Sequence, residues 1–212
     1  MRFQLSSLLV GIAAAVVSAQ DAPPQTGPFA LHITGKEGSS IDGYAGSCHA
    51  GAAIEGFCYS AGALPDGVSF QYYFNASSYT KVDDNDVGTL VWKLPYNDGS
   101  GNQATVDQAL GLQFSINSNV ASPMFGFSNY YFNVGFDKDS KLFGWNYIDD
   151  STFVPGTNPF PSGNGTAYYQ WYVCWQYFTS YYYQSVGWTL TGEPHNPTCE
   201  PVDITQVFPS SS

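Results

Sequence analysis

Carboxylates are the first residues whose chemistry could define a function, because a glycosidase places two of them on either side of a sugar. A retaining enzyme holds the two carboxyl groups about 5 Å apart. The four glutamates of the chain are Glu37, Glu55, Glu193 and Glu200. None lies within an aromatic strand-like segment, and the aromatic segment near the C-terminus carries glutamines where acids would be needed. We therefore rank a glycoside hydrolase below non-catalytic functions.

Histidine and acidic loops offer no better catalytic or metal-binding pattern. The three histidines, His32, His49 and His195, are far apart in sequence, and no Gly-x-Ser-x-Gly nucleophile elbow is present. An acidic loop begins at Asp83, but an EF-hand starting there would need a glutamate where Leu94 stands. We predict no catalytic residue, no metal ligand and no cofactor.

Aromatic side chains are the remaining candidates, since rings can stack on the apolar faces of sugars. If the segment 168–178 is a strand, its successive side chains point to opposite faces. One face then carries Tyr169, Trp171, Trp175 and Tyr177. These four residues are candidates for sugar stacking, and cell-wall or host glycans would be the partners. The alternative is that this face fills the core of the protein.

Four cysteines are present, and their number is even. In an oxidising compartment they would form two disulfides, with three possible connectivities. We favour the most local choice, which pairs Cys48 with Cys58 and Cys174 with Cys199. A zinc site is the rival, but no CxxC pair supports it.

The N-terminus has the pattern of a secretory signal. Arg2 precedes the apolar run 8–17, and Val17-Ser18-Ala19 supplies the small residues of a cleavage site. We therefore expect a secreted, extracellular protein, either free or associated with the cell wall. The predicted ranges are 1–19 for the signal peptide, 20–28 for a Pro-rich N-terminal arm, 29–208 for a single β-rich domain and 209–212 for a short tail.

Two sequons predict a glycoprotein. They are Asn75-Ala76-Ser77 and Asn164-Gly165-Thr166, so Asn75 and Asn164 are the candidate glycosylation sites. Each predicts a solvent-facing asparagine, because the transferase must reach it.

The charge balance excludes two classes of partner. The chain has 6 basic and 17 acidic residues, giving a net charge of −11, and Arg2 is its single arginine. Binding of nucleic acids or of anionic membranes requires clustered Lys and Arg. We therefore expect neither partner.

Strand patterns account for most of the chain. Short segments rich in Val, Ile, Tyr, Phe and Trp are separated by Gly, Asn and Asp. The one plausible helical turn is Gln103–Leu110. This pattern predicts an all-β, single-domain antiparallel β-sandwich or jelly roll with two disulfides. The expected strands are 29–33, 68–74, 88–94, 109–116, 130–136, 141–147, 168–178, 183–191 and 202–208.

Several segments resemble a known family. They are Cys48–Cys58 (CHAGAAIEGFC), Leu90–Pro95 (LVWKLP), Asn119–Pro123 (NVASP), Trp171–Cys174 (WYVC) and His195–Cys199 (HNPTC). The chain is similar to secreted proteins of filamentous fungi catalogued as a domain of unknown function, some of which are labelled small secreted cysteine-rich proteins. The resemblance implies an extracellular β-rich protein. It assigns no catalytic or binding residue.

The leading function on this basis is a non-catalytic secreted protein that acts in the cell wall, the matrix or a host-facing setting. A carbohydrate-binding, lectin-like module is the alternative, and a glycoside hydrolase is third. A concave aromatic groove with two facing carboxylates would favour the third.

Overall fold

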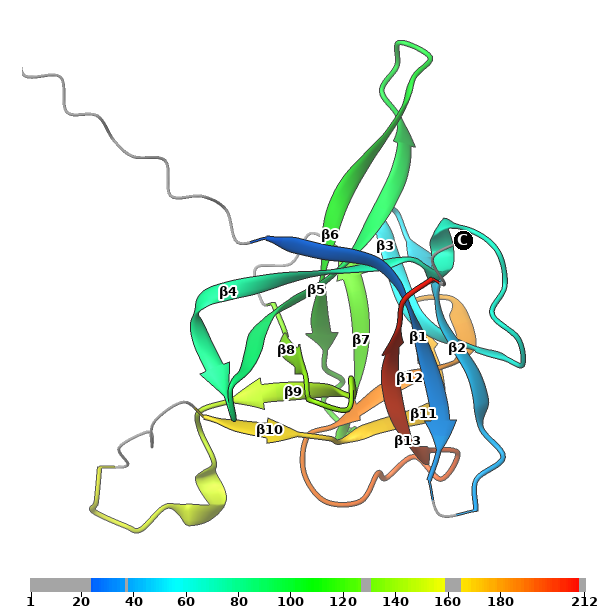
Figure 1. The fold of residues 1–212 in the computed structure, drawn as a ribbon. Helices are drawn as coiled ribbons and strands as arrows, with labels where there is room; N and C mark the ends of the chain where they lie inside the picture. The colour runs from blue at the N-terminus through cyan, green and yellow to red at the C-terminus, as the bar shows by residue number, and fades with distance from the viewer. Residues whose placement is uncertain (1–23, 37, 127–130, 159–164, 210–212) are drawn as a thin grey trace, which may run out of the picture.

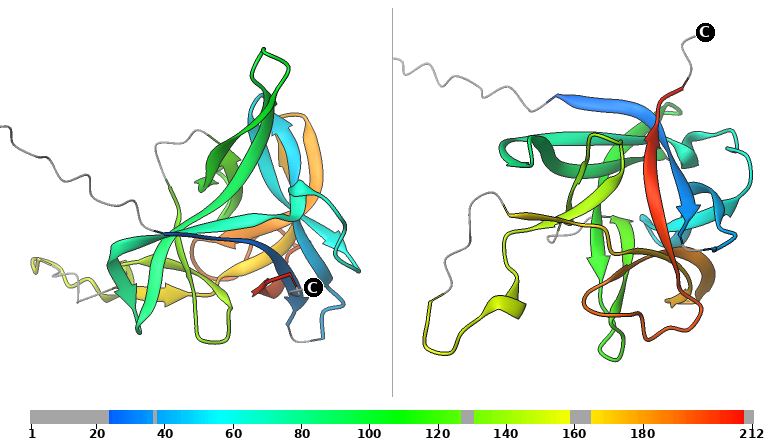
Figure 2. Two further views of the ribbon diagram at one scale, coloured as in Figure 1. Left: turned by 45° about the horizontal axis from the view of Figure 1, so that its top comes forward. Right: turned by 60° about the horizontal axis from the view of Figure 1, so that its bottom comes forward.

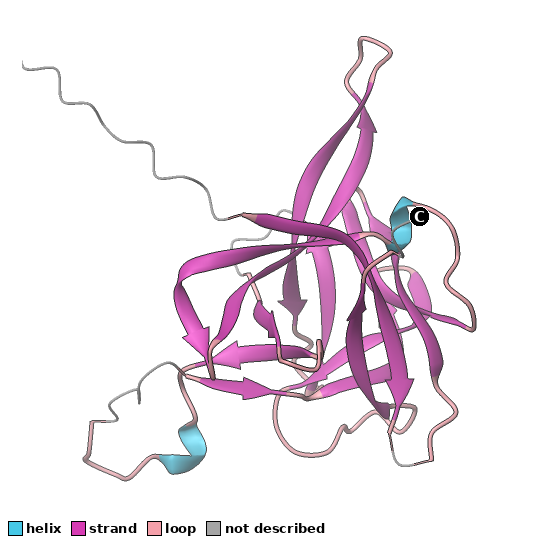
Figure 3. Cartoon of the chain, in the orientation of Figure 1, coloured by secondary structure: helices cyan, strands magenta, loops and turns pink. Residues whose placement is uncertain are grey.

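The computed structural model describes residues 24–36, 38–126, 131–158 and 165–209. Within them the chain forms thirteen strands and two short 3-10 turns, and no α-helix (Figure 1, Figure 3). The turns are η1 (Val68–Phe70) and η2 (Asp150–Thr152). The strands are β1 (Gln25–Gly35), β2 (Asp42–Gly51), β3 (Ile54–Ala61), β4 (Tyr72–Val82), β5 (Asn85–Asn97), β6 (Gln103–Gln113), β7 (Val120–Gly126), β8 (Asn133–Phe136), β9 (Leu142–Asn146), β10 (Thr166–Tyr168), β11 (Trp171–Phe178), β12 (Tyr181–Thr189) and β13 (Glu200–Val207).

All strand pairs are antiparallel, and they join into one sheet that curls back on itself. The pairings run β1–β4–β5–β6–β7–β12–β11–β13 and return to β1. Strands β2 and β3 bridge β1 to β7 and β12. A branch of β8, β9 and β10 continues from β5. The first and last strands therefore lie side by side (Figure 2). The prediction of an antiparallel all-β protein with two disulfides is confirmed.

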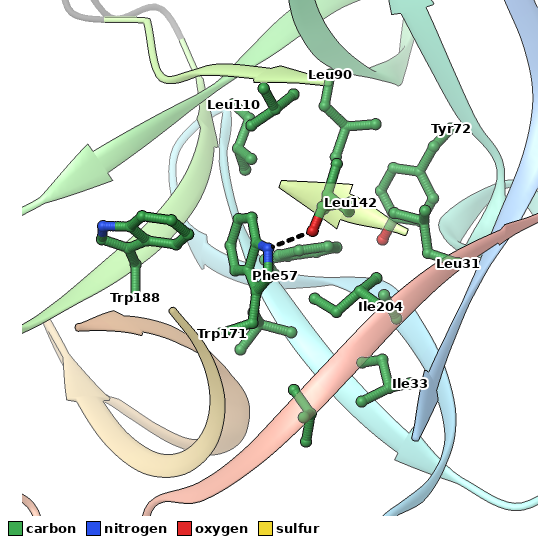
Figure 4. Close-up of a cluster of buried hydrophobic side chains, with 14 of the residues drawn as sticks. Leu31, Ile33, Phe57, Tyr72, Leu90, Leu110, Leu142, Trp171, Trp188 and Ile204 are labelled. Carbon is green, nitrogen blue, oxygen red and sulfur yellow. Dashed lines mark hydrogen bonds between the residues drawn. The ribbon is translucent and has the colours of Figure 1, made fainter. Parts of the chain in front are cut away.

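The core lies inside this curled sheet and draws side chains from almost every strand. Leu31 and Ile33 of β1 meet Ile204 of β13, while Phe57 and Tyr72 pack edge to face with ring centroids 5.7 Å apart (Figure 4). The alternation in β4 shows the reason, since Tyr72 and Phe74 are buried and their neighbours are not. Burial of these large apolar side chains is the main stabilising contribution.

Two of the turns between strands are formed by aspartates, whose short polar side chains suit turn geometry. Asp83 and Asp84 join β4 to β5 with positive φ angles of 47° and 65°, which short polar side chains tolerate. Asp137 closes the β8–β9 connection by accepting hydrogen bonds from the amides of Asp139 and Lys141, both at 2.9 Å. Both acidic segments are therefore turns between antiparallel strands.

The structure corrects the prediction in several places. Gln103–Leu110 is not a helical turn but most of β6, where pairing with β5 overrides local propensity. β1 begins at Gln25 and pairs with Asn75, so part of the predicted N-terminal arm belongs to the sheet.

Candidate functional site

Trp171 is one of the four predicted sugar-stacking residues, and the structure shows that this assignment is wrong. Its side chain is 1% exposed. Its indole Nε1 donates a 2.8 Å hydrogen bond to the carbonyl of Leu142, and its ring packs edge to face on Trp188, with centroids 4.7 Å apart (Figure 4). Trp171 lies where β11 is covered by the core, so it cannot meet a ligand from solvent.

Trp175 and Tyr177 do reach solvent, with 43% and 68% of their surface exposed. They project from the same face of β11 near the tip of the β11–β12 hairpin. Tyr182 of β12 stacks on Trp175, with ring centroids 5.2 Å apart. We call Trp175, Tyr177 and Tyr182 the hairpin patch.

The segment 190–199 fixes the backbone beneath the hairpin patch. The amide of Trp175 donates to the hydroxyl of Thr198 at 3.0 Å, and Asn196 Nδ2 donates to the carbonyl of Trp175 at 2.9 Å. The disulfide between Cys174 and Cys199 holds this segment against β11. The other disulfide joins Cys48 to Cys58 across the β2–β3 hairpin, so both predicted pairings are present.

Tyr169 is separate from the hairpin patch. Its hydroxyl donates to Asp137 Oδ2 at 2.9 Å, and its ring meets Phe143 edge to face. Burial and the bond to the Asp137 carboxylate raise the pKa of Tyr169 to about 12. The four predicted stacking residues therefore do not form one surface.

The predicted glycosylation sites are only partly described. Asn75 lies mid-strand in β4, on the face opposite the core residues Tyr72 and Phe74, and it is partly exposed. Its Oδ1 accepts a hydrogen bond from Gln25 Nε2 at 2.8 Å. Asn164 lies outside the described residues. Glycosylation at either position stays a prediction.

A cleft of about 630 Å³ lies where the β8–β9–β10 branch meets the end of β12, and the sequence analysis did not find it. Its aromatic floor is formed by Phe132, Tyr168 and Trp188, beside Gly144. A Cβ atom at Gly144 would come within 2.5 Å of the rings of Phe132 and Trp188, so glycine at this position leaves room for the floor. We call this cavity the β9–β12 cleft.

The rim of the β9–β12 cleft exposes several large apolar side chains. Tyr131 is 60% exposed, and four other large apolar side chains of the lining are also exposed. Polar groups lie among them. The exposed apolar residues are Phe114, Tyr131, Tyr147, Ile148 and Leu190, and the neutral polar residues are Asn133, Asn146, Ser151, Gln170 and Thr191.

One wall of the cleft is a turn that its own polar side chains hold in place. Asn146 Oδ1 accepts from the amides of Tyr147 and Ile148 at 2.8 and 3.2 Å. Asp149 caps η2 by accepting from the amide of Ser151 at 3.1 Å and from its hydroxyl at 2.5 Å. The segment leaves the body of the protein after β9, at the lower left of Figure 1. These hydrogen bonds fix the conformation of residues 146–151, which line the cleft.

The opposite wall depends on Asn119. Its Nδ2 donates to the carbonyls of Thr191 and Glu193 at 3.0 and 2.7 Å, and its Oδ1 accepts from the amide of His195 at 2.8 Å. Its backbone carbonyl accepts from the amide of Leu190 at 2.8 Å. One half-buried side chain thus positions the segment that supplies Leu190 and Thr191 to the cleft.

The charges at the cleft are all negative. Among its described lining residues, Asp149 and Asp150 are charged, and no Lys, Arg or His is present. The two acids are adjacent in sequence on one wall, so they do not face each other across the cleft.

Two of the three histidines pair with carboxylates away from the cleft. His32 Nε2 lies 2.7 Å from Asp42 Oδ1, and His49 lies 3.7 Å from Glu55. Burial raises the pKa of Glu55, although His49 partly opposes this shift. In the described part of the chain, no group of three or more His, Cys, Asp or Glu side chains could hold a metal ion. No helix among the described residues is long and apolar enough to cross a membrane.

Residues 26–208 match a domain of unknown function, DUF7907. The chain belongs to this family. The match begins within β1 and ends just after β13, so it covers every strand and the cleft. No curated protein and no solved structure matches the chain.

Proposed function

We propose that this DUF7907 protein is a secreted, non-catalytic, carbohydrate-binding protein of fungal origin, acting outside the cell in the wall, the matrix or a host-facing setting. The observation that carries the proposal is the β9–β12 cleft, which combines aromatic rings with amide and hydroxyl groups. Sugars present apolar C–H faces to rings and hydroxyls to such polar side chains. The disulfides support an oxidising location, and the resemblance to secreted fungal proteins supports the source.

The arrangement of acids favours binding over catalysis. A glycosidase needs carboxyls on opposite sides of the scissile bond. The acids among the described cleft residues, Asp149 and Asp150, are neighbours on one wall, and Asp149 already accepts two hydrogen bonds from Ser151. This supports a non-catalytic function.

A glycan array followed by titration of intrinsic tryptophan fluorescence tests the proposal. Trp188 in the cleft floor should report binding. We expect Tyr147→Ala to weaken binding about tenfold, the loss of roughly 1.4 kcal/mol of stacking contact. Tyr96→Ala is the matched control, because Tyr96 is similarly exposed but lies in the distant β5–β6 hairpin. Equal effects of the two substitutions would argue against the cleft.

The hairpin patch is the second candidate surface, because Trp175 and Tyr182 form an exposed stacked pair. Trp175→Ala separates the two surfaces. Loss of glycan binding in Trp175→Ala, with Tyr147→Ala unaffected, would move the site to the hairpin patch. Absence of binding to any glycan would reject the carbohydrate-binding function itself.

A further inference from the structure

The charge of the β9–β12 cleft selects among carbohydrates. Its described lining residues include two carboxylates, those of Asp149 and Asp150, and no basic side chain. Glu193 follows two residues after the lining residue Thr191 and adds to the negative charge of this end of the molecule. A uronic acid polymer would bring like charges together here, which is unfavourable.

The lysines do not neutralise these carboxylates, because four of them lie close to other carboxylates and the fifth lies away from the cleft. Lys36 and Lys141 both bind Asp203, at 2.9 and 2.6 Å. Lys81 pairs with Asp86 and Lys93 lies 3.7 Å from Asp107. Lys138 is in the turn that joins β8 to β9, at the opposite end of β9 from Asn146 and the cleft. None of the five lysines therefore lies among the described lining residues of the cleft.

The aromatic rim acts in the same direction as the carboxylates. Tyr131 and Tyr147 are both exposed in the lining. An ammonium group is attracted to the face of an aromatic ring, by about 0.5–1 kcal/mol at exposed sites. An ammonium group carried on a sugar ring would therefore be attracted both by the carboxylates and by the aromatic rings.

We propose that the β9–β12 cleft binds cationic amino-sugar oligosaccharides, such as oligomers of glucosamine with free amines. This inference rests on the proposed carbohydrate-binding function and specifies its ligand. Asp149 is held by Ser151, so Asp150 is the carboxylate best placed to meet an ammonium group. Asp150 is exposed and lines the cleft.

Calorimetric titration tests this specificity with four hexamers: glucosamine, N-acetylglucosamine, cellohexaose and galacturonic acid. At about pH 6 the free sugar amines are protonated. We expect the glucosamine hexamer to bind about tenfold more tightly than the neutral hexamers at low salt. The difference should shrink at high salt because exposed charges are screened. The galacturonic acid hexamer should bind most weakly.

A matched pair of variants locates the effect. Asp150→Asn keeps the shape of the side chain and should weaken glucosamine binding about threefold, as for an exposed ion pair. Asp66→Asn removes the same charge from an exposed position on a different surface and should change nothing. Equal losses in both variants would mean general attraction of a polycation to an acidic protein, and would overturn the assignment to the cleft.

The outcomes also separate this inference from the proposed function. Equally tight, salt-independent binding of cellohexaose or the N-acetylglucosamine hexamer would overturn the amino-sugar specificity and leave carbohydrate binding in place. If none of these hexamers binds and the glycan array is also blank, both proposals fail.

Discussion

At the scale of single residues, aromatic side chains occupy two kinds of position in this fold. Trp171 and Trp188 are buried and pack on each other, whereas Trp175 and Tyr177 on the same strand face are open to solvent. The difference arises from what covers each ring, because Trp171 packs against Phe132 and Trp188 inside the sheet, whereas Trp175 stacks on the exposed Tyr182. Aromatic content alone therefore does not identify a binding surface.

Asn119 holds the segment that supplies Leu190 and Thr191 to the β9–β12 cleft. Asn119→Ala removes three hydrogen bonds to the segment 190–195 and leaves their backbone partners unpaired. We expect the free energy of unfolding to fall by about 1–3 kcal/mol. Glycan affinity should fall as well, because Leu190 and Thr191 lose their fixed position.

Urea unfolding and fluorescence titration measure the two effects of Asn119→Ala. Asn117→Ala is the control, because Asn117 is exposed in the same loop. Unchanged stability in Asn119→Ala would show that water replaces the lost bonds and that the side chain does not set the cleft wall.

At the scale of elements, the two disulfides differ in how much of the chain they constrain. Cys48 and Cys58 are 10 residues apart on two strands that already pair, so their bond adds little new constraint. Cys174 and Cys199 are 25 residues apart, and their bond closes a loop that includes β12 and the cleft segment 190–191. The unfolded chain loses more entropy when the longer loop is closed.

We therefore predict unequal costs for removing the disulfides. The double variant Cys174→Ala/Cys199→Ala should lose about 2–4 kcal/mol of stability. The double variant Cys48→Ala/Cys58→Ala should lose less. Chemical denaturation of both variants gives the comparison, and an equal or greater loss in the second variant would contradict the loop-length argument.

The strands show which elements a sequence pattern can reveal. The β11–β12 hairpin was predictable because aromatic alternation continues on both sides of a two-residue turn at Thr179 and Ser180. β2 and β3 were missed because they are rich in Gly, Ala and Ser, which have low strand propensity. Their pairing depends on long-range contacts and on the disulfide between them.

The cleft could not be predicted for a related reason. Its lining comes from β6, β8, β9, β10, β12 and the segments that follow them. Phe132, Tyr168 and Trp188 look like ordinary core residues in the sequence, and only the curvature of the sheet brings them to one cavity. The aromatic composition led to the prediction of sugar stacking, which stays a prediction, and it could not indicate which rings are exposed.

At the scale of the whole molecule, the chain has 17 acidic and 6 basic residues, so few acids can pair with a base. The acids that do pair make the folding stability depend on pH. Asp203 is the central acidic partner. Burial raises its pKa, but the hydrogen bonds and charges of Lys141 and Lys36 outweigh burial and lower the pKa below 3.8. The same contact with Asp203 raises the pKa of Lys141 above 10.5. This network ties β1, β9 and β13 together.

We predict a broad stability plateau near neutral pH with losses on both sides. The lowered pKa of Asp203 means that the unfolded chain binds more protons near pH 3.8. The contribution of Asp203 is thus present above that pH and lost as the pH falls through its folded pKa. On the alkaline side, folded Tyr169 keeps its proton until about pH 12, whereas an ordinary tyrosine loses it near 10.0. Stability should therefore fall between pH 10.0 and about 12 as the unfolded state deprotonates first.

Melting temperatures measured across this pH range, at moderate ionic strength, check both limbs of the curve. Asp203→Asn should flatten the acid limb, because asparagine does not titrate. Tyr169→Phe should flatten the alkaline limb while keeping the ring contact with Phe143. Asp66→Asn is the control, because Asp66 is exposed and lies in the segment between β3 and η1 rather than in this network. An alkaline limb unchanged by Tyr169→Phe would mean that other groups control it, such as Lys141, whose pKa the contact with Asp203 raises, or Tyr72, whose pKa burial raises.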